Sequence, residues 1–268
     1  GDLPDANSGD RIADIVATQI VFAALPTDVG ATNGDVVSGT AFETQPVLQA
    51  QDADGQIDTH FTDTLSLTTD AGGTLSGTTS LQATGGVATF TDVTYTATQD
   101  GQSFALVAAD QAGGSGGDLP DANSGDRIAD IVATRIAFAT LPADDRADNG
   151  DVVSGIAFAT QPLLQATDDN GQIDRDTAGS LTLEVSTGSV ALIGTNAVAW
   201  SGGQVDFTSS GLGVTTTNDG SVFALDATSG DLTEATTGEL TTDIVATQLV
   251  FAALPTDVGA TNLSLIHI

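Results

Sequence analysis

The chain has 268 residues and carries 36 acidic against 5 basic side chains, so its formal net charge is −31. It contains neither cysteine nor methionine, which excludes disulfides and cysteine-ligated zinc. The charge argues against nucleic acid and anionic membranes as partners, and no apolar run reaches the ~18 residues of a membrane span. Because the first residue is Gly1 rather than methionine, we expect a fragment or a processed product.

An internal repeat organises the chain. Residues 1–18 recur unchanged at 117–134, and residues 243–262 repeat 14–33 with one change, Ile20 to Leu249. Self-similarity at a fixed long period is the signature of tandem repeat proteins. The last six residues, 263–268, match nothing in the repeat and resemble a translated sequencing adapter, so we interpret them as a non-native scar.

Within each repeat, short apolar runs alternate with polar residues at the period of a β-strand. The run 18–25 comes first and 45–51 next, and apolar pairs or triplets then recur near 65–67, 88–90 and 104–108. Asp-Gly and Asn-Gly turn signals separate these runs, and no segment keeps a helical period for three turns. About seven short strands in ~100 residues are typical of an immunoglobulin-like sandwich. We therefore expect an all-β chain of tandem immunoglobulin-like β-sandwich domains in an elongated array.

Four motifs carry a family resemblance. They run from Ile15 to Pro26, from Gln45 to Gly55, from Gly73 to Thr79 and from Gly86 to Phe90. Together they resemble the tandem bacterial Ig-like repeats of large surface proteins, and the second copy departs from the pattern at 188–204. The resemblance implies an extracellular stalk or adhesin arm at the bacterial cell surface, and it implies no particular ligand.

The repeat also predicts domain boundaries. Residues 1–16 would be the last strand of a preceding repeat, 17–133 and 134–246 two complete Ig-like repeats, and 247–262 the first strand of a following repeat. Almost no linker separates consecutive repeats, which predicts a fairly stiff rod whose partners are neighbouring repeats. A glycan or protein receptor at the cell surface would be bound by modules outside this chain.

Catalysis has few candidate residues. The chain lacks cysteine and lysine, and outside the scar its one histidine, His60, is replaced by Asp176 in the second copy. Serine and threonine are abundant but have no base to activate them. We therefore expect no enzyme activity and no catalytic or organic-cofactor site.

Calcium is the one cofactor that the sequence suggests. Each copy places hard oxygen ligands around a tight glycine turn. The candidates are Asp52, Asp54 and Asp58 in the first copy and Asp168, Asp169, Asn170 and Asp174 in the second. A plain hairpin turn is the favoured interpretation, because the spacing is not that of an EF-hand. A second acidic loop, 110–126, is expected at the same end of the sandwich, where calcium could bridge two domains. Adaptation to high salt is the competing account of the aspartates.

The function predicted from these features is mechanical. The chain would be a structural spacer of a secreted or surface-displayed bacterial repeat protein, such as an adhesin-like stalk. One alternative is a carbohydrate- or protein-binding Ig-like module, which an exposed patch around Trp200 would support. Another is a non-catalytic spacer of a large secreted hydrolase.

Overall fold

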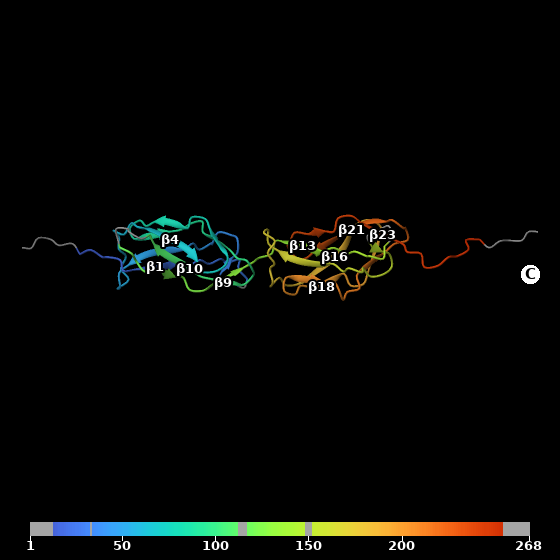
Figure 1. Cartoon of the computed structure of the whole chain (residues 1–268), viewed down its shortest axis with the longest axis horizontal. Coiled ribbons are helices and arrows are strands. Elements are labelled where there is room, and N and C mark those ends of the chain that lie inside the picture. Colours follow the sequence, from blue (N-terminus) through green and yellow to red (C-terminus); the bar gives the residue numbers. More distant parts are fainter. Residues whose placement is uncertain (1–12, 33, 112–116, 148–151, 254–268) are drawn as a thin grey trace, which may run out of the picture.

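A computed structural model describes residues 13–32, 34–111, 117–147 and 152–253. These residues form 23 strands and no helix, so none of them belongs to a helix that could cross a membrane. The strands gather into two bodies that lie end to end along the long axis (Figure 1). We call them the first module (19–130) and the second module (135–243). The predicted all-β fold of tandem sandwiches is confirmed.

The first module is a sandwich of small sheets. One sheet has the order β1 (Gln19–Ala24), β3 (Val47–Gln51), β7 (Val87–Thr89). The other has the order β11 (Ala122–Asn123), β10 (Leu106–Asp110), β4 (Thr64–Thr69), β6 (Ser80–Gln82). A further sheet joins β2 (Val36–Val37), β12 (Arg127–Asp130) and β9 (Gln102–Phe104), with β2 parallel to β12. The pair β5 (Thr74–Ser76) and β8 (Thr94–Thr96) completes the module.

The second module repeats this layout. Its first sheet is β13 (Arg135–Thr140), β15 (Leu163–Thr167), β19 (Gln204–Asp206). Its second is β14 (Val152–Val153), β23 (Leu240–Asp243), β21 (Val222–Thr228), β16 (Ser180–Thr187), β18 (Ala197–Ala199), with β22 (Ala235–Thr236) also on β21. The pair β17 (Ala191–Ile193) and β20 (Gly213–Thr215) matches β5 and β8. The divergent stretch 188–204 therefore keeps the strand pairing of the first copy.

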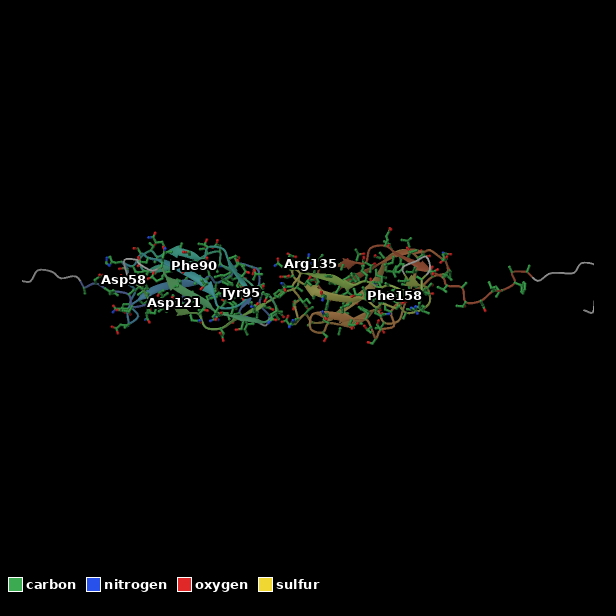
Figure 2. The ribbon with its side chains drawn as sticks, viewed as in Figure 1. Asp58, Phe90, Tyr95, Asp121, Arg135 and Phe158 are labelled. Carbon is green, nitrogen blue, oxygen red and sulfur yellow. The ribbon has the colours of Figure 1, made fainter. Side chains whose placement is uncertain are left out.

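The period-two pattern places the core between the sheets. On β3, Leu48 and Ala50 are fully buried and lie opposite Phe22 and Ile20 of β1. Each module has its own cluster of buried apolar side chains, and no buried residue belongs to both. Figure 2 shows Phe90 and Tyr95 within the first module and Phe158 within the second.

At one pair of equivalent positions, the first module has a large side chain where the second has a small one, and the reverse. The first module has Phe61 and Ala83, and the corresponding positions of the second hold Thr177 and Trp200. The backbone is the same in both: the N–H of Ala83 donates to the carbonyl of Asp63 and the N–H of Trp200 to that of Gly179, at 3.0 and 3.1 Å. Trp200 is only 8% exposed and packs in the second core. It therefore forms no exposed patch of the kind that a carbohydrate-binding surface would need.

The partial repeats at the two ends differ from expectation. Residues 13–16 and 247–253, where the sequence predicts strands of a preceding and a following repeat, form no strand. In the complete copies these positions pair with strands of their own repeat, such as β2 with β12 and β13 with β15. The chain does not contain the corresponding partners. The predictions for 1–12 and 254–268, the scar included, lie outside the described residues.

Candidate functional site: the junction between the modules

The two modules are joined by four residues, 131–134, between the end of β12 and the start of β13. Carboxylates from both sides hold this linker. The N–H of Ile131 donates to Asp100 Oδ1 of the first module at 2.9 Å. The N–H of Ala133 donates to Asp174 Oδ2 of the second module, also at 2.9 Å. The linker is thus clamped by one acidic side chain from each module.

Asp100 also bonds directly across the junction. It lies in the turn between β8 and β9, and its Oδ2 accepts the N–H of Arg175 at 3.0 Å. Gly39, in the turn that follows β2, approaches the second module as well, since a Cβ at this glycine would lie 3.4 Å from Nδ2 of Asn170. Two small cavities, of about 250 and 160 Å³, are lined by residues of both modules.

Three carboxyl groups meet at this junction. One oxygen each of Asp100, Asp174 and Asp176 lies within 4.8 Å of the others. Burial acts to raise the pKa of Asp174, but hydrogen bonds from Asp176, from the Ala133 N–H and from Thr177 outweigh it and lower that pKa. The hydrogen bond to Asp174, followed by burial and nearby negative charge, raises the pKa of Asp176 to about 7. Of this pair, Asp176 is therefore the carboxyl group that takes up a proton first as the pH falls.

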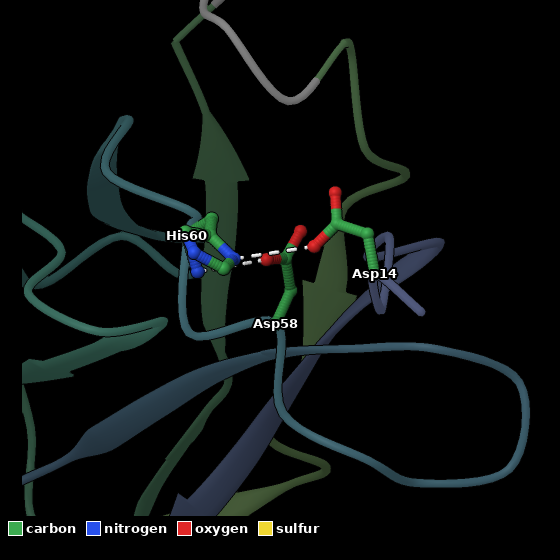
Figure 3. Close-up of side chains that lie close together, drawn as sticks. All are labelled: Asp14, Asp58 and His60. Carbon is green, nitrogen blue, oxygen red and sulfur yellow. Dashed lines mark hydrogen bonds and ion pairs between the residues drawn. The ribbon is translucent and has the colours of Figure 1, made fainter. Parts of the chain in front are cut away.

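The same arrangement recurs at the start of the first module (Figure 3). Asp58, the counterpart of Asp174, accepts the N–H of Ala17 at 3.1 Å and that of His60 at 2.9 Å. His60 Nδ1 lies 3.2 Å from Asp14 Oδ1, and both side chains are largely exposed. Asp14, Asp58 and His60 form the second group that offers clustered metal ligands in the described part of the chain.

The far end of the second module carries one half of the clamp. Asp219 is the counterpart of Asp100, and its Oδ1 accepts the N–H of Ile244 at 2.9 Å. Ile244 corresponds to Ile131 in the repeat. The clamp is therefore a feature of the repeat unit and not of one junction.

The other predicted calcium ligands stabilise turns. Asp52 Oδ1 accepts the N–H groups of Asp54 and Gln56 at 3.0 and 2.8 Å. Asp168 Oδ1 accepts those of Asn170 and Gln172 at 2.9 and 2.8 Å. The glycines of both turns, Gly55 and Gly171, have φ near +80°, which L side chains rarely adopt.

Of the seven predicted ligands, only Asp58 and Asp174 thus belong to a cluster. Asp52, Asp54, Asp168, Asp169 and Asn170 lie outside both groups. Asp169 instead accepts the hydroxyl of Thr134 at 3.0 Å. Calcium binding at these residues stays a prediction.

The acidic loop 110–126 begins at the same end of the first module as Asp58. Asp110 pairs with Leu65 at the start of β4, and the N–H of Gln111 donates to the carbonyl of Thr64 at 3.0 Å. Burial raises the pKa of Asp110, and the charges of Asp63 and Asp118 add to this effect. Residues 112–116 of this loop lie outside the described residues.

Sequence reasoning missed four members of the two clusters: Asp14, His60, Asp100 and Asp176. Asp100 was recognised only as part of an Asp-Gly turn signal, which says nothing about its neighbours across the junction. The exchange of His60 for Asp176 between the copies predicts an exposed strand or loop position, and the His60 side chain is indeed largely exposed. Histidine and aspartate can both bind protons or metal ions, and this shared property of His60 and Asp176 is the feature of the sequence that could have indicated the clusters.

Comparisons with known proteins give little beyond the fold class. No family model and no curated protein matches the chain. Among solved structures it is similar to a β-glycosidase from Bacteroides vulgatus, with 13% identity and a TM-score of 0.30 over 84% of this chain and 24% of that one. It is also similar to a β-glucuronidase from Parabacteroides merdae, with 12% identity and a TM-score of 0.29 over 82% and 25%.

A third such structure is a glycosyl hydrolase family 2 member from Bacteroides cellulosilyticus, with 13% identity and a TM-score of 0.31 over 84% and 28%. The chain spans about a quarter of the length of these proteins. Likenesses with TM-scores this low assign neither a family nor an activity.

Proposed function

We propose that the chain is a structural spacer of a secreted or surface-displayed bacterial repeat protein. The observation that carries this proposal is the clamped junction, where Asp100 and Asp174 hold consecutive parts of a four-residue linker from opposite sides. A linker held in this way transmits orientation from one module to the next. Flexible tethers, by contrast, are long and rich in glycine and serine.

The spacer proposal covers two kinds of parent protein. An adhesin-like stalk would project a binding module from the cell, and a secreted hydrolase would use the same modules to hold its catalytic part. The similar solved structures are glycosidases, but their TM-scores are too low to favour the hydrolase. In either parent these modules are non-catalytic, and glycan or receptor binding belongs to other modules.

Calcium has its best place at the junction. Three carboxylates from two modules would offer the hard oxygen ligands that Ca²⁺ takes, although Ca²⁺ needs 6–8 such ligands. The spacer proposal does not depend on calcium, because the clamp hydrogen bonds are complete without it.

Small-angle X-ray scattering of the full chain tests the spacer proposal. We expect an elongated particle with the cross-section of a single module, as in Figure 1. Insertion of a Gly-Ser-Gly-Ser segment between Ala133 and Thr134 is the control, and it should broaden the distance distribution. A native chain that scatters like the insertion variant would show a flexible tether and refute the proposal.

A further inference from the structure

The segment that follows β23 is a second copy of the segment that forms β1. Residues 243–253 repeat 14–24 with a single change, Ile20 to Leu249. In the first module, Ile20 lies in the core at 5% exposure. Residues 244–253, by contrast, pair with no strand among the described residues, and Leu249 and Phe251 are 101% and 83% exposed. The sequence of a core strand therefore stands in solvent.

β1 is a strand that another segment can replace. It lies at the edge of its sheet and pairs with β3 alone. Its Ile20 and Phe22 lie opposite Ala50 and Leu48, and Leu249 and Phe251 have the same spacing. Exchange of isoleucine for leucine conserves side-chain volume, which cores tolerate well.

The first module is the better acceptor for this segment. The side-chain amide of Gln19 donates to the carbonyl of Asp52 at 3.0 Å, and Gln248 is the equivalent residue. In the second module β13 has Arg135 at this position and shares only a Phe-Ala pair with 248–253. Residues 248–253 therefore match the site of β1 and not that of β13.

The far end of the second module is an uncovered junction face. Ile131 is fully buried at the junction within the chain, whereas its counterpart Ile244 is 41% exposed. Gly39 faces Asn170 across the junction, whereas a Cβ at its counterpart Gly155 would meet open space. The face that docks a module in the first repeat is thus present and open in the second.

Both halves of a clamp are available for a new junction. Asp219 already accepts the N–H of Ile244 at 2.9 Å. At the start of the first module, Asp58 accepts the N–H of Ala17 at 3.1 Å, and Ala246 is the counterpart of Ala17. With 243–253 in the place of 14–24, the linker would be held from both sides, as Asp100 and Asp174 hold it within the chain.

The acceptor must be a second copy of the chain. Figure 1 shows the segment after β23 leaving the second module at the end remote from the first, so that the whole second module lies between this segment and β1. Ten residues of extended chain reach at most about 36 Å. They start at the far face and lead away from the first module, so they meet the β1 site of another copy and not their own.

We propose that copies of this chain join head to tail by strand exchange, in which residues 244–253 of one copy replace 15–24 in the first module of the next. Exchange of an identical element between protomers is a low-cost route to association. Because the incoming strand gains the pairing that the outgoing one loses, the balance depends on the newly covered end faces and on protein concentration. The contact is heterologous, so it extends into chains or closes into rings. This inference goes beyond the spacer function, since it concerns the assembly of separate copies.

Refolding at two protein concentrations tests the proposal. β1 has to leave its site before another strand enters, so the full chain is unfolded in urea and then refolded. The buffer contains about 1 M NaCl, which screens the repulsion between acidic copies. Sedimentation velocity should show mainly dimers and longer oligomers after refolding at about 0.5 mM, and monomers after refolding at about 1 µM, as mass action requires.

Two variants separate strand exchange from other association. Leu249→Asp places a carboxylate at the position that Ile20 occupies in the core, and it should lower the oligomer fraction at least tenfold, because a buried unpaired charge is costly. Ala252→Asp is the matched control. It adds the same charge at a residue whose counterpart, Ala23, is exposed on β1, so this variant should oligomerise like the native chain. Both positions are exposed in the monomer, so both variants should fold.

A disulfide between two different chains locates the exchanged strand. Gln19 lies opposite Gln51, so a Gln248→Cys chain refolded together with a Gln51→Cys chain should give a disulfide-linked heterodimer under mild oxidation. Ala252→Cys in place of Gln248→Cys should give at least fivefold less. The chain has no cysteine of its own that would compete.

Two results would overturn the exchange. A native chain that stays monomeric after refolding at high concentration overturns it and leaves the spacer proposal intact, because the junction within the chain is unaffected. Oligomers of Leu249→Asp as abundant as those of the native chain would mean that copies associate through another surface.

Discussion

Trp200→Ala should destabilise the second module selectively. The indole is 8% exposed, and its Nε1–H donates to the Ser229 hydroxyl at 2.8 Å, which in turn donates to the Ser180 carbonyl at 3.0 Å. Truncation of a buried tryptophan costs about 3–5 kcal/mol of unfolding free energy, because it removes apolar contacts and leaves a cavity.

This cost predicts a large shift in melting temperature. For a module of roughly 110 residues, a loss of 1 kcal/mol lowers the melting temperature by about 4 °C. The second module should therefore melt about 12–20 °C lower than in the native chain, while the first module moves by only a few degrees. The exposed Thr187→Ala on β16 is the control and should change stability by less than about 0.5 kcal/mol.

The two modules can be followed separately. The chain has one tryptophan, in the second module, and one tyrosine, Tyr95, which is buried in the first module and stacks on Phe104 with ring centroids 3.9 Å apart. In native protein, tryptophan emission reports the second module and tyrosine the first. In the Trp200→Ala variant, calorimetry replaces the lost signal. A cost below about 1 kcal/mol would refute the core assignment of Trp200.

The remaining predictions concern the loops that shape the junction. Gly203→Ala should cost about 2 kcal/mol or more, since its φ is +73° and a Cβ would lie 2.1 Å from the carbonyl oxygen of Asp174. Gly202 has a similar φ of +60°, but a Cβ there would meet open space. Gly202→Ala should therefore lose less stability in thermal melts, and the difference between the two variants measures the cost of the close contact at Gly203. Asp168→Ala removes the acceptor of two N–H groups and should cost about 2 kcal/mol, equally in EDTA and in CaCl₂. A loss seen only with calcium would show that Asp168 is a metal ligand.

The fold class could be predicted because it depends on local patterns. Alternating apolar residues such as Leu48 and Ala50 set the buried face of β3, and glycine turns end the strands. The same reasoning predicts the first strand of a following repeat at 247–262, and the described part of it, 247–253, forms no strand here. Leu249 and Phe251 have the right pattern but remain exposed, because a strand also needs a pairing partner and these residues pair with no strand among the described residues.

The junction could be predicted only in part. Asp58 and Asp174 follow a recognisable turn, for which the sequence favours a plain hairpin and offers calcium as the alternative, and both carboxylates accept backbone N–H groups of the chain segment that enters their module. Asp100 and Asp176 come from turns 76 positions apart that meet only when two modules dock. No local pattern encodes such a contact. The replacement of Phe61 and Ala83 by Thr177 and Trp200 likewise becomes clear only when the equivalent backbone hydrogen bonds of the two modules are compared.

The central claim is that the two modules keep a fixed mutual orientation. Residual dipolar couplings of backbone amides in the partly aligned full chain at pH 5 test it most directly, because each module yields its own alignment tensor. The clamped linker predicts that both modules share one tensor, equal in magnitude and direction when fitted to a single rigid body. Two tensors of clearly different magnitude would mean that the modules reorient independently, which would contradict the spacer account.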